Sequence, residues 1–147
     1  MRVASSSSFI EKAKLSGAQS LLGAFTHRTG RFDHCMRGLQ IKRIGDGEVE
    51  CEIAVDEHLQ NAYGTLHGGA ISTLVDVVGT LALLSLDPTR AGVSVEMNTT
   101  FVAAAKAGAA VSVTGRVLKA GKKLGFTSVD LRVGAQLVAT GRHTKAL

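Results

Sequence analysis

The stretch from residue 61 to residue 86 constrains the fold of this chain more than any other part of the sequence. It begins with a polar loop that contains Gly64, Gly68 and Gly69, and it runs directly into the longest apolar segment of the chain. From Gly69 onward, apolar side chains occupy nearly every direction around a helical turn of 3.6 residues. Because a helix that is apolar on all sides must be buried on all sides, the sequence predicts a central helix around which the rest folds.

A single carboxylate, Asp76, lies within this apolar helix. Its desolvation is costly unless it is hydrogen-bonded, paired or placed at an interface. The helix begins at His67, Gly68 and Gly69, where each glycine costs about 1 kcal/mol relative to a better helix former. The amides at a helix N-terminus suit an oxygen that gains negative charge. Two interpretations remain open: these residues form an active site, or His67 is a helix cap and Asp76 a contact between helices or subunits.

Length and composition exclude several classes of protein. The 147 residues suit one domain with a substantial core. The apolar segment is about as long as a membrane span, but its central carboxylate and interrupting Ser and Thr residues argue against one. Residues 61–147 carry nine Lys and Arg against four Asp and Glu, whereas residues 1–60 carry eight of each. This diffuse surplus, with one Tyr and no Trp, does not fit a nucleic-acid-binding protein but suits a phosphorylated small ligand.

The cysteines and histidines have no spacing that predicts a metal site. Cys35 and Cys51 form no CxxC pair, and the five histidines form no HExxH or similar set. We therefore expect two reduced structural thiols, no metal ion and no cofactor.

The first 35 residues allow two interpretations. Residues 1–32 hold five Lys and Arg, one Glu and a run of serines, a composition similar to that of a mitochondrial transit peptide. The same residues also form a helical arm, with an apolar face that is interrupted near Gly17. We favour the helical arm over 1–35, and a cytoplasmic or mitochondrial location remains open.

From Leu39 the hydrophobic period changes from helical to alternating. Val49, Cys51, Ile53 and Val55 face one way after a turn at residues 45–47, which predicts a β-hairpin. Asp87 and Pro88 end the central helix, and four more strands are predicted over residues 93–102, 110–119, 124–133 and 137–144. Short turns join the later strands, so we expect antiparallel neighbours.

The order of elements predicts an α+β fold: a helical arm, two strands, a long buried helix and four strands. A single sheet covers such a helix only by curling around it, and a second layer has to come from elsewhere. A second copy of the chain is the simplest source, and pairing of sheet edges between copies would also protect exposed strands. We therefore expect a homo-oligomer.

Several separated motifs give the chain a resemblance to a known family. They are the loop NAYGTLHGG at 61–69, the LVD triplet at 74–76, GVSVEMN at 92–98 and GFTSVD at 125–130. In this order and spacing they resemble the hotdog-fold acyl-CoA thioesterases. The resemblance runs from about Leu39 to the C-terminus and implies a hotdog domain over residues 36–147, a curved antiparallel sheet wrapped around one long helix. It also implies acyl-CoA hydrolysis in fatty acid metabolism, and a dimer or a homotetramer built as a dimer of dimers.

The resemblance assigns roles to specific residues. Gly68 matches the glycine whose amide polarises the thioester carbonyl, Asn61 matches the residue that assists it, and His67 helps to position that group. Asp76 matches the carboxylate that orients or deprotonates the attacking water, and Ser94 matches the hydroxyl that holds this water. In the family, Asp76 and Ser94 act together with Gly68 of the partner subunit, which places Asp76 at a dimer interface.

Further assignments come from the residues themselves. Gly69 is assigned to the substrate-binding residues. A turn is surrounded by Lys119, Lys122 and Lys123, which either bind the phosphates of coenzyme A or are simply solvated. Ser94 is out of phase with Val93 and Val95, so a place on the solvent face is its alternative.

The reaction type also has alternatives. A GxSxG nucleophile elbow is absent from the sequence, which favours direct attack by water over an anhydride formed at Asp76. A hotdog-fold hydratase or dehydratase and a non-catalytic acyl-CoA-binding scaffold are the other candidate functions.

Overall fold

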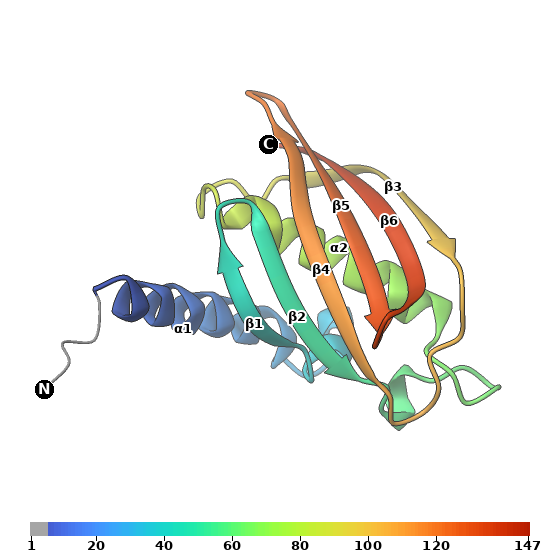
Figure 1. Cartoon of the computed structure of the whole chain (residues 1–147). Helices are drawn as coiled ribbons and strands as arrows, with labels where there is room; N and C mark the ends of the chain where they lie inside the picture. Colours follow the sequence, from blue (N-terminus) through green and yellow to red (C-terminus); the bar gives the residue numbers. More distant parts are fainter. Residues whose placement is uncertain (1–5) are drawn as a thin grey trace, which may run out of the picture.

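The computed structural model describes residues 6–147, with side chains from residue 14 onward, and these residues form two helices, two short 3₁₀ segments and a six-stranded sheet (Figure 1). The helices are α1 (Ser6–Thr26) and α2 (Gly68–Leu84), and the 3₁₀ segments are Phe32–Met36 and Glu57–Leu59. The strands are β1 (Gln40–Gly45), β2 (Glu48–Ala54), β3 (Val93–Phe101), β4 (Ala110–Ala120), β5 (Leu124–Val133) and β6 (Gln136–Ala146). The predicted α+β hotdog fold is confirmed, with each predicted strand found within a few residues of its expected limits.

The strands pair antiparallel in the order β1-β2-β4-β5-β6-β3. β2 shows why the alternating sequence forms a strand: Val49, Cys51 and Ile53 are buried in the core, while the glutamates between them lie on the other face. The chain leaves β2, forms α2 and then places β3 at the far edge of the sheet. Figure 1 shows the sheet curving around α2, which lies in its concave face.

Glycines in the sheet let α2 approach the strands closely. A Cβ at Gly115 of β4 would lie 2.8 Å from the carbonyl oxygen of Val78, and one at Gly141 of β6 would lie 2.8 Å from the Val75 side chain. Val75 and Val78 are fully buried as a result. The sheet-facing side of α2 thus forms the centre of the hydrophobic core.

The opposite side of α2 is not fully covered within one protomer. Asp76, Val77, Thr80 and Leu84 are only half-buried, so the sheet of a single chain does not supply the second layer that this helix was expected to need. The sheet covers one side of α2, and α1 lies beyond an open groove on the other. Among the described residues, no helix has the length and apolar character that a membrane span requires.

α1 packs along the β1 edge of the sheet (Figure 1). The Oε1 atom of Gln19 accepts a hydrogen bond of 2.7 Å from the Ile41 amide, and Leu22 is buried in the core. The predicted helical arm is therefore present, and α1 continues through Gly17, near which its apolar face was predicted to be interrupted. Residues 1–5 of the predicted arm or targeting segment lie outside the described residues.

β3 forms the other edge of the sheet, pairing with β6. Its apolar side chains remain exposed, with Val93 at 73% and Val95 at 61% of their accessible surface. An exposed edge strand of nine residues is a surface on which another strand pairs readily.

Candidate active site

Hydrogen bonds hold the loop before α2 in place at the helix N-terminus. The Asn61 Oδ1 atom accepts hydrogen bonds from the amides of Tyr63 at 2.9 Å and Thr65 at 3.2 Å. The amide of Leu66 donates to the Ala105 carbonyl, and the amide of His67 donates to the Leu59 carbonyl, both at 2.8 Å. Asn61 thus organises the loop that delivers the chain to the start of α2.

His67 caps α2 and leaves the next amide available. The Gly69 amide donates to the Nδ1 atom of His67 at 2.8 Å, so one of the first helical amides is already satisfied. Gly68 is the first residue of the helix, and an amide at this position has no acceptor within the helix. The Gly68 amide is therefore placed, together with the positive end of the helix dipole, to receive an oxygen that carries negative charge.

A second polar group lies eight residues further along α2, around Asp76. The Nε2 atom of His143, on β6, lies 2.8 Å from the Ser94 Oγ atom on β3 and 3.8 Å from the Asp76 Oδ1 atom. The Asp76 side chain retains 47% of its exposure, whereas the His143 side chain has none. The carboxylate and the hydroxyl thus border solvent, and the imidazole supports them from the interior.

A β-bulge explains how Ser94 reaches this group. The pairing of β3 with β6 shifts between Ser94 and Glu96, so that Ser94 pairs with Lys145 and Met97 pairs with His143. Paired residues share a face of the sheet, and Lys145 and His143 are both buried on the face that carries α2. Because Ser94 is out of phase with Val93 and Val95, a place on the solvent face was the alternative for its side chain. The regular alternation on which this alternative depends does not continue through the bulge.

Lys145 is a second buried polar side chain of β6 close to Asp76, with 6% of its surface exposed. Its Nζ atom donates to the Thr80 Oγ1 atom at 2.8 Å, and this hydroxyl donates to the Asp76 carbonyl at 2.8 Å. Burial lowers the pKa of Lys145, while the nearby Asp76 charge opposes this effect. Lys145 thus lies close enough to the Asp76 carboxylate for the two groups to interact electrostatically.

Sequence reasoning did not identify His143 and Lys145 as part of a site. Their signal is nevertheless present in the alternation of β6, where residues 139, 141, 143 and 145 face the core and the last two of them are polar. Polar side chains at core positions of a strand require partners, and here those partners are Ser94 and Thr80.

Burial lowers the pKa of His143 below its ordinary value of 6.5, although Asp76 opposes this shift. Among the described residues, its Nδ1 atom is buried without a hydrogen-bond partner. Since the imidazole of His143 binds a proton more readily in the unfolded chain, His143 favours folding fully above pH 6.5, and this contribution is lost as the pH falls through the folded-state pKa.

We expect the melting temperature to fall between pH 7.5 and pH 5.5, and to fall less in His143→Gln. If the melting temperature changed equally with pH in both proteins, His143 would not be the cause of the pH dependence.

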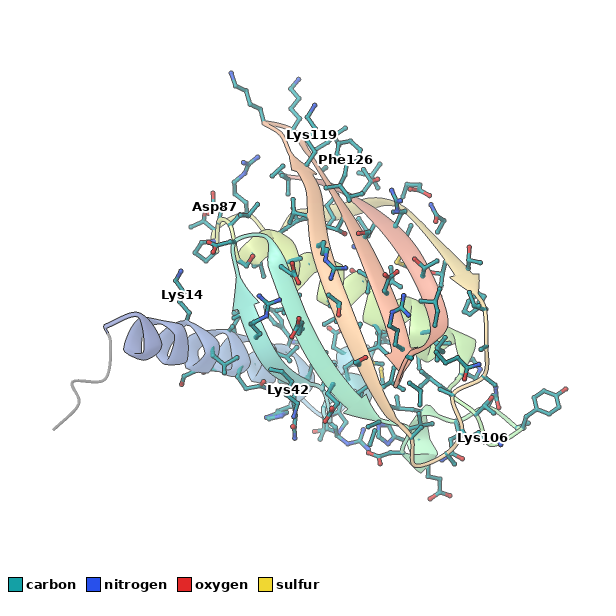
Figure 2. All side chains as sticks on the ribbon, viewed as in Figure 1. Lys14, Lys42, Asp87, Lys106, Lys119 and Phe126 are labelled. Atoms are coloured by element: carbon teal, nitrogen blue, oxygen red, sulfur yellow. The ribbon has the colours of Figure 1, made fainter. Side chains whose placement is uncertain are left out.

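The three predicted lysines lie at the other end of the molecule from Gly68. Figure 2 shows Lys119 at the tip of the β4–β5 hairpin and Lys106, which bridges to Thr65 just before α2, at the opposite end of the sheet. The hairpin lies beside the C-terminal end of α2, where Gly125 contacts Leu83. Lys122 and Lys123 are exposed, and Arg90 binds the turn by donating to the carbonyls of Gly121 at 3.2 Å and Lys122 at 2.7 Å.

Comparison with known proteins identifies the family. Residues 63–143 match the model of the thioesterase superfamily. The chain is 46% identical to human acyl-coenzyme A thioesterase 13 over 118 residues, which cover 79% of this chain and 84% of the relative. It therefore belongs to the thioesterase superfamily.

Solved structures agree with this assignment. Thioesterase superfamily member 2 of zebra fish superposes with a TM-score of 0.86 at 40% identity, covering 90% of this chain and 97% of that one. A thioesterase protein from Streptococcus pneumoniae, solved with coenzyme A, superposes with a TM-score of 0.70 at 25% identity over 74% of this chain and 86% of its own.

Proposed function

We propose that this protein hydrolyses acyl-CoA thioesters to the free acid and coenzyme A. The observation that carries the proposal is the group formed by Asp76, Ser94 and His143, in which a solvent-bordering carboxylate and hydroxyl are held by a buried imidazole. The name of the human relative, acyl-coenzyme A thioesterase 13, and the coenzyme A in the bacterial structure support the substrate class.

In the proposed reaction, water attacks the thioester carbonyl carbon and transfers a proton to the Asp76 carboxylate. Ser94, fixed by its hydrogen bond to His143, orients this water. The carbonyl oxygen becomes an oxyanion and accepts a hydrogen bond from a Gly68 amide, assisted by Asn61, with His67 ordering the helix start. Collapse of the tetrahedral intermediate breaks the C–S bond, and the departing thiolate takes the proton held by Asp76, which releases coenzyme A as a thiol and restores the carboxylate. A general base contributes about 10² to 10⁴ in rate and an oxyanion donor about 10² to 10³.

The geometry of α2 favours an active site that is shared between subunits. Gly68 and Asp76 are eight residues apart on one straight helix, which separates them by about 12 Å along its axis. Reacting groups must approach one another to about 3 to 3.5 Å, so Gly68 and Asp76 of one protomer cannot both act on the same thioester carbonyl. We propose a homo-oligomer in which two β3 edges meet and Asp76 of one subunit acts with Gly68 of the other.

The buried position of His143 argues against a hydratase. Such an enzyme needs a base that reaches a substrate proton, whereas the His143 side chain is fully buried and its Nε2 atom is hydrogen-bonded to Ser94. An anhydride at Asp76 remains the alternative to attack by water.

The lysine turn is the proposed site for the phosphates of coenzyme A. Lys122 and Lys123 are exposed, and Arg90 fixes the turn that presents them. Neutralising both, as Lys122→Gln with Lys123→Gln, is expected to raise KM several-fold with little change in kcat, because these residues contact the nucleotide and not the reacting carbon. Lys42→Gln, on the β1 edge, is the matched control. If KM stays the same in the double variant, the lysines are solvated side chains.

The proposed function is tested with a panel of acyl-CoA substrates of increasing chain length and an assay of thiol release. We expect hydrolysis well above the uncatalysed rate for at least one chain length. Binding of these substrates without any turnover would instead identify a non-catalytic scaffold.

A further inference from the structure

Two adjoining apolar cavities, of about 330 and 360 Å³, separate α1 from α2. Both are lined by Leu21 of α1, by Leu81 and Leu84 of α2, and by Pro88 in the loop after α2. Since the cavities share these four walls, they form one groove, which we call the arm groove.

The arm groove begins at the proposed site of reaction. Its near end is lined by Asp76, Val77 and Thr80, and its far end by Lys14, Gly17 and Ile44. Lys14 lines the far end of the groove, and Figure 2 shows it on α1, distant from Lys106. The groove follows α2 from Asp76 to Ser85, which is about 13 Å along the helix axis.

The lining leaves apolar surface exposed on α1. Leu21 retains 37% and Phe25 retains 56% of its accessible surface, and both border the groove. An apolar groove that starts at a reactive carboxylate is suited to a hydrocarbon chain attached to the reacting carbon. The opposite side of α2 is packed tightly on the sheet through Gly115 and Gly141. A hydrocarbon chain can therefore follow α2 only on the side that faces α1.

We propose that the arm groove receives the acyl chain of the thioester, and that α1 sets the longest chain that the enzyme accepts. This inference rests on the proposed hydrolysis of acyl-CoA. It gives a function to a helix that lies outside residues 63–143, the part matched by the family model.

The first test fills the far end of the groove with Gly17→Phe. Apart from neighbouring residues and backbone of its own helix, no described atom lies within 4 Å of a Cβ at Gly17, so a larger side chain has room at this position of the groove wall. Ser16→Phe is the matched control, because Ser16 lines a different surface of α1 together with Gln19 and His27. The readout is the ratio of kcat/KM for dodecanoyl-CoA to that for acetyl-CoA.

Each methylene displaced from an apolar wall costs roughly fourfold in kcat/KM, so this ratio is expected to fall at least tenfold in Gly17→Phe. The ratio in Ser16→Phe is expected to equal that of the unmodified protein. An unchanged ratio in Gly17→Phe overturns the proposal.

The second test is independent of turnover and uses the absence of tryptophan from the sequence. Leu21→Trp places a single tryptophan in the groove wall, where S-hexadecyl-coenzyme A, a thioether that is not hydrolysed, is expected to shift its emission to shorter wavelength. Coenzyme A alone is expected to cause no shift.

The two tests separate failure of the inference from failure of the proposed function. A shift with the thioether in a protein that hydrolyses no acyl-CoA leaves the groove assignment standing and removes the catalytic one. Hydrolysis without a shift, or an emission that changes with protein concentration because a second copy covers the groove, overturns the groove assignment.

Discussion

Asp76→Asn is expected to lower kcat/KM for acyl-CoA hydrolysis by about 10² to 10⁴, because the amide cannot accept the proton of the attacking water. The substitution keeps the size of the side chain, and about half of this side chain is exposed, so the fold and the oligomeric state are expected to persist. Thiol release measures the loss of activity, light scattering measures the oligomeric state, and circular dichroism measures the fold.

Asp130→Asn is the matched control for Asp76→Asn. Asp130 lies on β5 and accepts a hydrogen bond of 2.7 Å from Thr140, away from the Asp76 group. Its substitution is expected to leave kcat/KM within about twofold, as for a substitution outside the site. If Asp76→Asn hydrolysed acyl-CoA as fast as the unmodified protein, the general-base mechanism would be wrong, and with it the anhydride route.

Gly68→Pro is expected to lower kcat by about 10² to 10³, because proline has no amide hydrogen to donate to the oxyanion. Gly68 is the first residue of α2, a position at which proline is favoured in helices. The preceding residue, His67, already has the extended backbone that a following proline requires, with φ −64° and ψ 137°. The helix is therefore expected to remain while its oxyanion donor is lost.

Gly68→Ala is the control that keeps the amide. A Cβ at this position would lie 3.5 Å from the Phe101 ring, an ordinary van der Waals distance, so most of the activity is expected to remain. Equal activity in the proline and alanine variants would show that the Gly68 amide does not stabilise the transition state.

Most of the fold was predictable because its signals are local. The alternation in β2, the turns between β4, β5 and β6, and the stop at Asp87-Pro88 each act within a few residues, and the strands follow them. The helical arm was predictable from its sequence as well, and α1 continues through Gly17. The contacts of Gln19 and Leu22 with the sheet hold this part of α1.

The candidate site was predictable only in part, because it depends on pairing between distant strands. His143 is 49 residues from Ser94 along the chain, and the bulge in β3 that brings their side chains within 2.8 Å has no clear signature in the sequence. Periodicity counts apolar positions of α2 without showing which of them a single protomer covers, so the half-buried state of Asp76 followed only from the need for a second layer and from the family resemblance.

The central claim, that one site takes Asp76 and Gly68 from different subunits, is tested most directly by mixing two inactive variants. Homodimers of Asp76→Asn and of Gly68→Pro each lack one half of both sites. A heterodimer has one intact site, and random exchange of subunits is expected to restore about one quarter of the unmodified activity. A mixture that has exchanged subunits, verified by mass, and still shows only the activity of the separate variants would contradict the shared site.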